Sequence, residues 1–189
     1  EGEPGIGKSE LVNQLVVQSA MADNWSILGE ASNVERSTPY YIMRGIFETI
    51  FGLDRDAMTA SRKAAQVRQF THELPAELSA LLPLLNDIID TDFPESSFIT
   101  QLTGERRTDN LHILAVAVIN RARQVRSLRV IVLDDVQWMD EASWKLTRAL
   151  IDQVSEVRFV LVTRLMLDSS SAILQNLRQE SSTRHVFIA

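Results

Sequence analysis

The sequence predicts an α/β fold in which a parallel sheet is covered by helices on both faces. Three short segments are apolar on both sides of an extended chain, as strands buried in a parallel sheet are. They are WSILGEAS at 25–32, LRVIVLDDV at 128–136 and VRFVLVTR at 157–164. A weaker fourth candidate is RHVFIA at 184–189. Helical patterns separate these segments, and strands that alternate with helices need crossover connections and pair in parallel.

Two amphipathic helices are expected beside the strands, at 10–22 and 143–154. The region between the first two strands carries almost no strand signal and reads as helical pieces at 40–51, 57–72, 77–89 and 108–125. Pro83 should kink the third piece or end it, and residues 90–97 read as a loop. We therefore expect a single domain over 1–189, with an α/β core at 1–38 and 126–189 and a helical insertion at about 39–125.

Composition narrows the function classes. The 189 residues include no cysteine, which excludes disulfides and thiolate metal sites and fits a reducing compartment, so we expect a cytoplasmic location. The formal net charge of −6 argues against non-specific binding to nucleic acid or to an anionic membrane. No apolar run approaches the roughly 18 residues that a membrane-spanning helix needs.

A phosphate-binding turn opens the chain. GEPGIGKS fits the pattern G-x-x-x-x-G-K-[ST], the P-loop or Walker A motif, and an amphipathic helix follows it. Backbone N–H groups of such a turn cradle phosphate at the positive end of the helix, and the lysine adds a point charge. The alternative is a chance glycine turn, which the position before a helix disfavours. The expected nucleotide contacts are Gly2, Glu3, Pro4, Gly5, Ile6, Gly7, Lys8 and Ser9.

An acidic pair ends the second strand, as in a Walker B motif. A carboxylate at the carboxyl end of a core parallel strand faces the crevice where ligands bind. We expect Asp134, with the hydroxyl of Ser9, to serve Mg²⁺. Asp135 stands where many hydrolysing relatives place a glutamate that polarises the attacking water, and we expect a catalytic role for it. Because Asp135 is one methylene shorter, either a working base or a slow or inactive site fits. A strand that merely ends in solvated acids is the alternative.

Arg164 follows the third strand, and with Thr163 it should reach the γ-phosphate region if this strand lies between the Walker A and Walker B strands. Its planar fork of donors suits phosphate, so we assign Arg164 a sensing role at the catalytic site. A surface arginine that caps a strand is the alternative. Core packing suits Trp138 and Trp144 better than base stacking, and it suits Tyr40 and Tyr41 better than contact with the adenine. Five arginines at 106–126 suit a solvated helix face.

Together GEPGIGKS, LDDVQWMDEASW and LVTR resemble the P-loop ATPase domain of the STAND branch of the AAA+ superfamily. Within that branch, FGLD, LLNDIIDTDFPES and VFIA are most similar to the soluble, type 10 adenylate cyclase family. The resemblance implies ATP and Mg²⁺ as ligands, and a regulatory module of a protein in cAMP signalling. Its partners would be cyclase or repeat domains of the same polypeptide, with no direct contact to nucleic acid. It also implies that this chain is a fragment lacking the P-loop strand, which would lie between the 184–189 and 157–164 strands.

Three functions remain open at this point. The first is an ATP-binding and possibly hydrolysing switch. The second is a scaffold that holds nucleotide without turnover, which the aspartate at 135 favours. The third is the ATPase domain of a transcription regulator or DNA-loading protein, against which the acidic charge of this segment argues.

Overall fold

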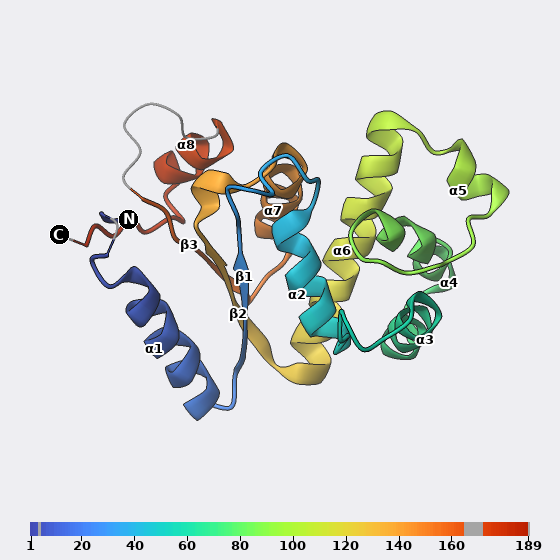
Figure 1. The fold of residues 1–189 in the computed structure, drawn as a ribbon, viewed down its shortest axis with the longest axis horizontal. Helices are drawn as coiled ribbons and strands as arrows, with labels where there is room; N and C mark the ends of the chain where they lie inside the picture. The colour runs from blue at the N-terminus through green and yellow to red at the C-terminus, as the bar shows by residue number, and fades with distance from the viewer. Residues whose placement is uncertain (4, 165–171, 189) are drawn as a thin grey trace.

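The computed structural model describes residues 1–3, 5–164 and 172–188, and its centre is a parallel sheet (Figure 1). The three named strands are β1 (Trp25–Glu30), β2 (Leu128–Asp134) and β3 (Arg158–Leu161). They pair in the order β1-β2-β3, all parallel, with Glu30 opposite Asp134 and Leu133 opposite Leu161. All three predicted strands are confirmed, each a little shorter than its apolar run.

Helices cover both faces of the sheet, so the fold has three layers (Figure 1). On one face, α1 (Lys8–Met21) packs on β1 and β2. A small apolar cluster forms there around Val12, Val130, Val132 and Val162. The other face carries the main core and the helices α2 (Tyr41–Phe51), α6 (Gly104–Arg126) and α7 (Glu141–Gln153). The predicted α/β architecture with a covered parallel sheet is confirmed.

The region between β1 and β2 is helical, as expected. Beyond α2 and α6, which pack directly on the sheet, lie α3 (Ala60–Thr71), α4 (Ala76–Ser79), the 3-10 helix η1 (Leu82–Asp87) and α5 (Ser97–Gln101). Pro83 lies in the first turn of η1, so the expected boundary is confirmed, whereas the short α5 was not predicted. The division into core and insertion stays a prediction.

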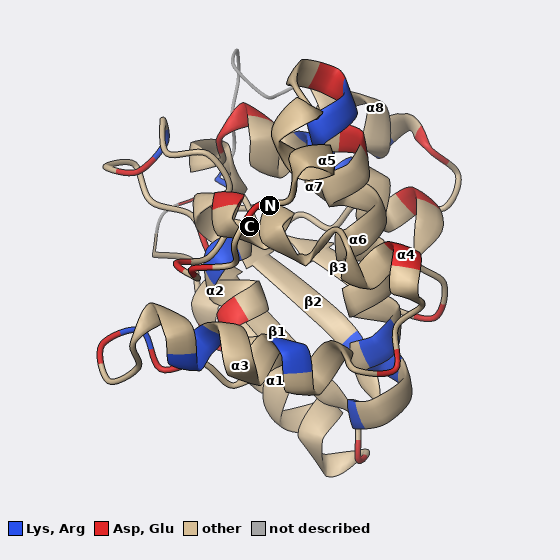
Figure 2. Cartoon of the chain, turned by 90° about the vertical axis from the view of Figure 1, so that its right-hand side faces the viewer, with Lys and Arg blue, Asp and Glu red and all other residues tan. Residues whose placement is uncertain are grey.

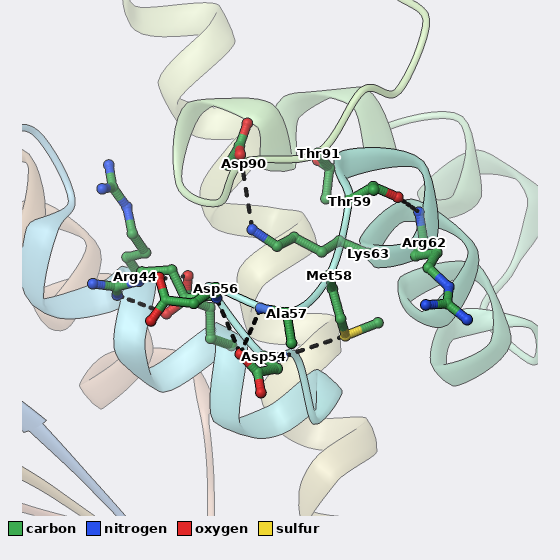
Figure 3. A network of polar contacts seen from close by, with 12 residues as sticks. Arg44, Asp54, Asp56, Ala57, Met58, Thr59, Arg62, Lys63, Asp90 and Thr91 are labelled. Atoms are coloured by element: carbon green, nitrogen blue, oxygen red, sulfur yellow. Dashed lines mark hydrogen bonds and ion pairs between the residues drawn. The ribbon is translucent and has the colours of Figure 1, made fainter.

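Polar contacts fix the link between α2 and α3 (Figure 3). The Asp54 carboxylate accepts hydrogen bonds from the backbone N–H groups of Asp56 and Ala57, which closes the turn after α2. Lys63 on α3 is buried, with 3 % of its side chain exposed, and its ammonium lies 3.7 Å from the Asp90 carboxylate (Figure 3). This pair holds α3 against the segment after η1.

The end of the chain differs from the prediction. A helix, α8 (Ala172–Gln179), lies there and was not predicted. The expected strand at 184–189 is wrong in extent: residues 184–187 are not in a strand, Ile188 forms an isolated bridge, and Ala189 lies outside the described residues. That bridge is made to Gly2, which also bridges Arg164 on its other side, and both are parallel. The start of the chain thus lies between the two segments expected to flank a P-loop strand; whether such a strand is missing stays a prediction.

Candidate functional site

The glycine turn before α1 has the backbone shape that its glycines permit. Gly5 and Gly7 have φ angles of 82° and 98°, in the left-handed region that other residues adopt only under strain. Gly7 is the N-cap of α1, and no side chain caps the helix. The first N–H groups of α1 are therefore left free for an anion, at the positive end of the helix. A Cβ on Gly5 or Gly7 would meet no atom within 4 Å, so the cradle is open.

The side chain of Lys8 folds back onto the glycine turn that precedes it. Its ammonium donates hydrogen bonds to the carbonyl oxygens of Gly2 at 2.9 Å and Glu3 at 2.7 Å. Ile6 and Ser9 are exposed beside it, and Ser9 lies in the first turn of α1. The predicted contact Pro4 lies outside the described residues. Lys8 is therefore held by its own loop at the open mouth of the cradle.

Asp134 lies at the end of β2, within electrostatic range of Lys8 in the turn before α1. It is partly buried and accepts a hydrogen bond from the backbone N–H of Asp135 at 2.8 Å. Burial raises the pKa of Asp134 and the neighbouring Asp135 adds to that, while the Asp135 N–H and the positive charge of Lys8 oppose it. Two motifs more than a hundred residues apart in the sequence thus place an ammonium and a carboxylate within electrostatic reach of each other.

A side-chain network joins the acidic pair to the end of β3. The guanidinium Nε of Arg164 lies 3.7 Å from Asp135 Oδ1. Gln137 Nε2 donates to the same carboxylate oxygen at 2.7 Å. Gln137 Oε1 accepts hydrogen bonds from Thr163 Oγ1 at 3.1 Å and from the backbone N–H of Arg164 at 3.2 Å. Gln137 lies in LDDVQWMDEASW, which carries the family resemblance, but nothing in the sequence assigned it a role of its own.

Magnesium with a bound nucleotide fits the residues at this edge. Within residues 1–3, 5–164 and 172–188, no group of three or more His, Asp or Glu side chains could hold a metal without help. The donors present are the Ser9 hydroxyl and the Asp134 carboxylate, both hard oxygen ligands, and because burial raises the pKa of Asp134, a nearby cation would favour its charged form. Mg²⁺ is usually held by one or two carboxylates together with phosphate oxygens, so this sparse donor set suits it.

The stretch after the acidic pair is anchored in the core. Asp140 is 7 % exposed and caps α7 by accepting from the backbone N–H of Ser143 at 2.8 Å and its hydroxyl at 2.5 Å. The same carboxylate accepts from the backbone N–H of Tyr40 at 3.0 Å, at the start of α2. Trp144 and Tyr40 are buried, so their predicted packing role is confirmed. Asp140 thus ties the candidate site to α2 and α7.

Several arginines on α6 contact neighbouring side chains. Arg107 pairs with Asp87 and Glu95, and Arg121 pairs with Glu73. Arg126 lies over the rings of Trp25 and Phe70. In Figure 2, acidic and basic residues intermingle around the periphery of the ribbon. These contacts favour a structural role for the arginines over a surface for nucleic acid. Among the described residues, no helix is both long and apolar enough to cross a membrane.

The sequence profile of the AAA ATPase domain family matches residues 1–163, which include the glycine turn, the acidic pair and Thr163. The chain belongs to the AAA ATPase domain family. The P-loop NTPase fold expected from the sequence is thereby confirmed in its class. Membership of this family supports nucleotide binding by the chain, and which residues bind the nucleotide stays a prediction.

Individual proteins that match the chain do so at low sequence identity. The chain is 25 % identical over 153 residues to the mouse protein named Adenylate cyclase type 10, covering 80 % of this chain and 9 % of the relative. It is 24 % identical to the rabbit protein of that name, covering 93 % of this chain and 11 % of the relative. It is also 24 % identical to the human protein of that name, covering 80 % of this chain and 9 % of the relative. The chain thus spans about a tenth of the length of these relatives. The predicted resemblance is confirmed, and no solved structure matches the chain.

Proposed function

We propose that this AAA ATPase domain binds Mg·ATP at the turn before α1 and acts as a nucleotide-dependent regulatory switch. The observation that carries the proposal is the shape of the turn before α1, in which Gly5 and Gly7 are left-handed and Gly7 begins the helix without a side-chain cap. The turn and the N–H groups at the start of α1 would hold the phosphates. Ser9 and Asp134 would hold Mg²⁺, which supplies positive charge to the β- and γ-phosphates.

The switch part of the proposal rests on the contacts behind the site. Arg164 would exchange its contact with Asp135 for the γ-phosphate, because guanidinium binds phosphate oxygens well. Asp140 links the same stretch to α2 and α7, so a movement at the site reaches both helices. We propose that the surrounding protein resembles adenylate cyclase type 10, with cyclase domains outside these residues, and that it acts in the cytoplasm.

Calorimetry of Mg·ATP binding tests the nucleotide site. Lys8→Ala should weaken binding about 10- to 100-fold, the value of one charge-assisted hydrogen bond. The matched control is Lys145→Ala, because Lys145 is an exposed lysine on α7 that pairs only with Glu141 among the described residues. The control should stay within about twofold of the unaltered chain. Equal affinities for the unaltered chain and Lys8→Ala would show that the site is misassigned.

A scaffold without turnover is the second candidate, and one observation favours it. The Asp135 carboxylate oxygen already faces Gln137 and Arg164, and an aspartate reaches less far than a glutamate. Steady-state phosphate release separates the two candidates. Turnover that is lost in Asp135→Asn supports an ATPase, whereas tight binding with no release in the unaltered chain supports the scaffold.

A further inference from the structure

Gln137 occupies a bridging position in the candidate site, and none of the roles proposed above accounts for it. It follows the acidic pair in the 3-10 helix η2 (Val136–Trp138) and is partly buried. Its side chain spans from Asp135 on its own segment to Thr163 and Arg164 after β3. The two segments also share a backbone hydrogen bond, from the Val136 N–H to the Val162 carbonyl at 3.0 Å. Gln137 thus adds a side-chain link to segments that the backbone already holds side by side.

The chemistry of the neighbours fixes which way the Gln137 amide faces. An ionised carboxylate only accepts hydrogen bonds and a backbone N–H only donates. The amide nitrogen must therefore face Asp135 Oδ1 and the amide oxygen must face the Arg164 N–H, as the structure has them. A single amide side chain satisfies a carboxylate on one side and an N–H and a hydroxyl on the other. A glutamate, a methionine or a shorter asparagine cannot do all three.

Asp135 itself depends on such support. Its backbone is left-handed, with φ 52°, and 38 % of its side chain is exposed. The contact with Arg164 is long, at 3.7 Å, whereas the Gln137 contact is a short hydrogen bond at 2.7 Å. Gln137 therefore orients the Asp135 carboxylate more firmly than Arg164 does. If Arg164 turns to a γ-phosphate, Gln137 is the contact that still holds Asp135.

We propose that Gln137 is a positioning residue, which orients the Asp135 carboxylate and couples it to the Thr163–Arg164 segment. The proposal rests on the proposed function, because it matters only if Asp135 acts on a water beside bound ATP. Gln137 itself touches neither nucleotide nor water in this scheme. Its loss should lower turnover without lowering affinity, because the phosphate contacts come from the turn before α1.

The test compares Gln137→Met with Gln153→Met in the 189-residue chain. Gln153 is an exposed glutamine at the end of α7 and serves as the matched control. Gln137→Met should lower phosphate release about 10- to 100-fold, as misplaced catalytic groups do, with the dissociation constant for Mg·ATP changed less than about threefold. A residue that only supported the fold of the site would lower the affinity for Mg·ATP together with turnover, so the split between the two marks positioning of Asp135.

Gln137→Glu guards against a variant that fails to fold, since it keeps the shape and the acceptor for the Arg164 N–H. It removes the donor to Asp135, so it should lose turnover as Gln137→Met does. Full turnover in either variant, or equal losses in affinity and turnover, would overturn the proposal. Lys8-dependent binding without any turnover in the unaltered chain would overturn it too while leaving the nucleotide site standing. Absence of binding in the unaltered chain would overturn both.

Discussion

The Asp140 carboxylate makes three hydrogen bonds in the core, and their loss should be measurable as stability. Asp140→Ala removes the N-cap of α7, worth about 1 kcal/mol. It also leaves the buried N–H of Tyr40 without its acceptor, which costs about 1–3 kcal/mol, and it frees the buried hydroxyl of Ser143. The expected loss in the free energy of unfolding is about 3–4 kcal/mol, a large part of the 5–15 kcal/mol typical of a domain.

Urea denaturation measures this loss, and two further variants show its cause. With a slope of about 2 kcal/mol per molar urea, the midpoint should fall by about 1.5–2 M in Asp140→Ala. Asp140→Asn should cost only about 1 kcal/mol, because Oδ1 accepts both backbone N–H groups and an asparagine keeps that oxygen. Ser143→Ala, which removes only the Oδ2 contact, should cost about as little. A loss below about 1 kcal/mol in Asp140→Ala, or equal losses in the alanine and asparagine variants, would refute this reasoning.

Three other variants test the site and the core by thermal unfolding. Burial raises the pKa of Asp134, so the ionised carboxylate destabilises the folded chain at a pH above that pKa. Asp134→Asn should therefore raise Tm by about 1–3 °C at pH 7.5. The gain should vanish at low pH, where Asp134 is protonated in both the folded and the unfolded chain. Burial lowers the pKa of His112 below 6.5, so as the pH falls the histidine takes up a proton more readily in the unfolded chain than in the folded one. Protonation therefore lowers stability, and His112→Leu should reduce the drop in Tm between pH 7.5 and 5. A Cβ on Gly29 would lie 3.0 Å from Ile42 Cγ1, so Gly29→Ala should cost about 1–2 kcal/mol, whereas Gly45→Ala, with no atom within 4 Å, should not destabilise.

Much of the fold could be predicted because a strand that is buried on both faces of a sheet has a continuous apolar run in the sequence. The runs that became β2 and β3 are apolar at almost every position, and only a strand covered on both sides explains that pattern. The 184–189 segment has a similar but shorter run, yet Val186 and Phe187 are 60 % and 61 % exposed. Its run therefore lacks the packing that makes a strand. The short helices α5 and α8 were missed because so few turns give little periodicity.

The site was predictable where the backbone sets the chemistry and not where side chains meet across the fold. Gly7 and Lys8 could be selected because a phosphate turn needs their types at fixed spacing. Asp134 could be selected because it ends a buried strand. Gln137 and Asp140 could not, since their roles depend on Arg164 and Tyr40, which lie far away in the sequence. Local patterns carry no information about such distant partners.

The most direct measurement is the affinity of the chain for Mg·ATP, with and without the Lys8 ammonium. The account predicts saturable, magnesium-dependent binding to the unaltered chain and a loss of about 10- to 100-fold in Lys8→Ala, with Lys145→Ala unchanged. Binding that survives Lys8→Ala intact, or no binding by the unaltered chain, would contradict the assignment of the turn before α1 as a nucleotide site.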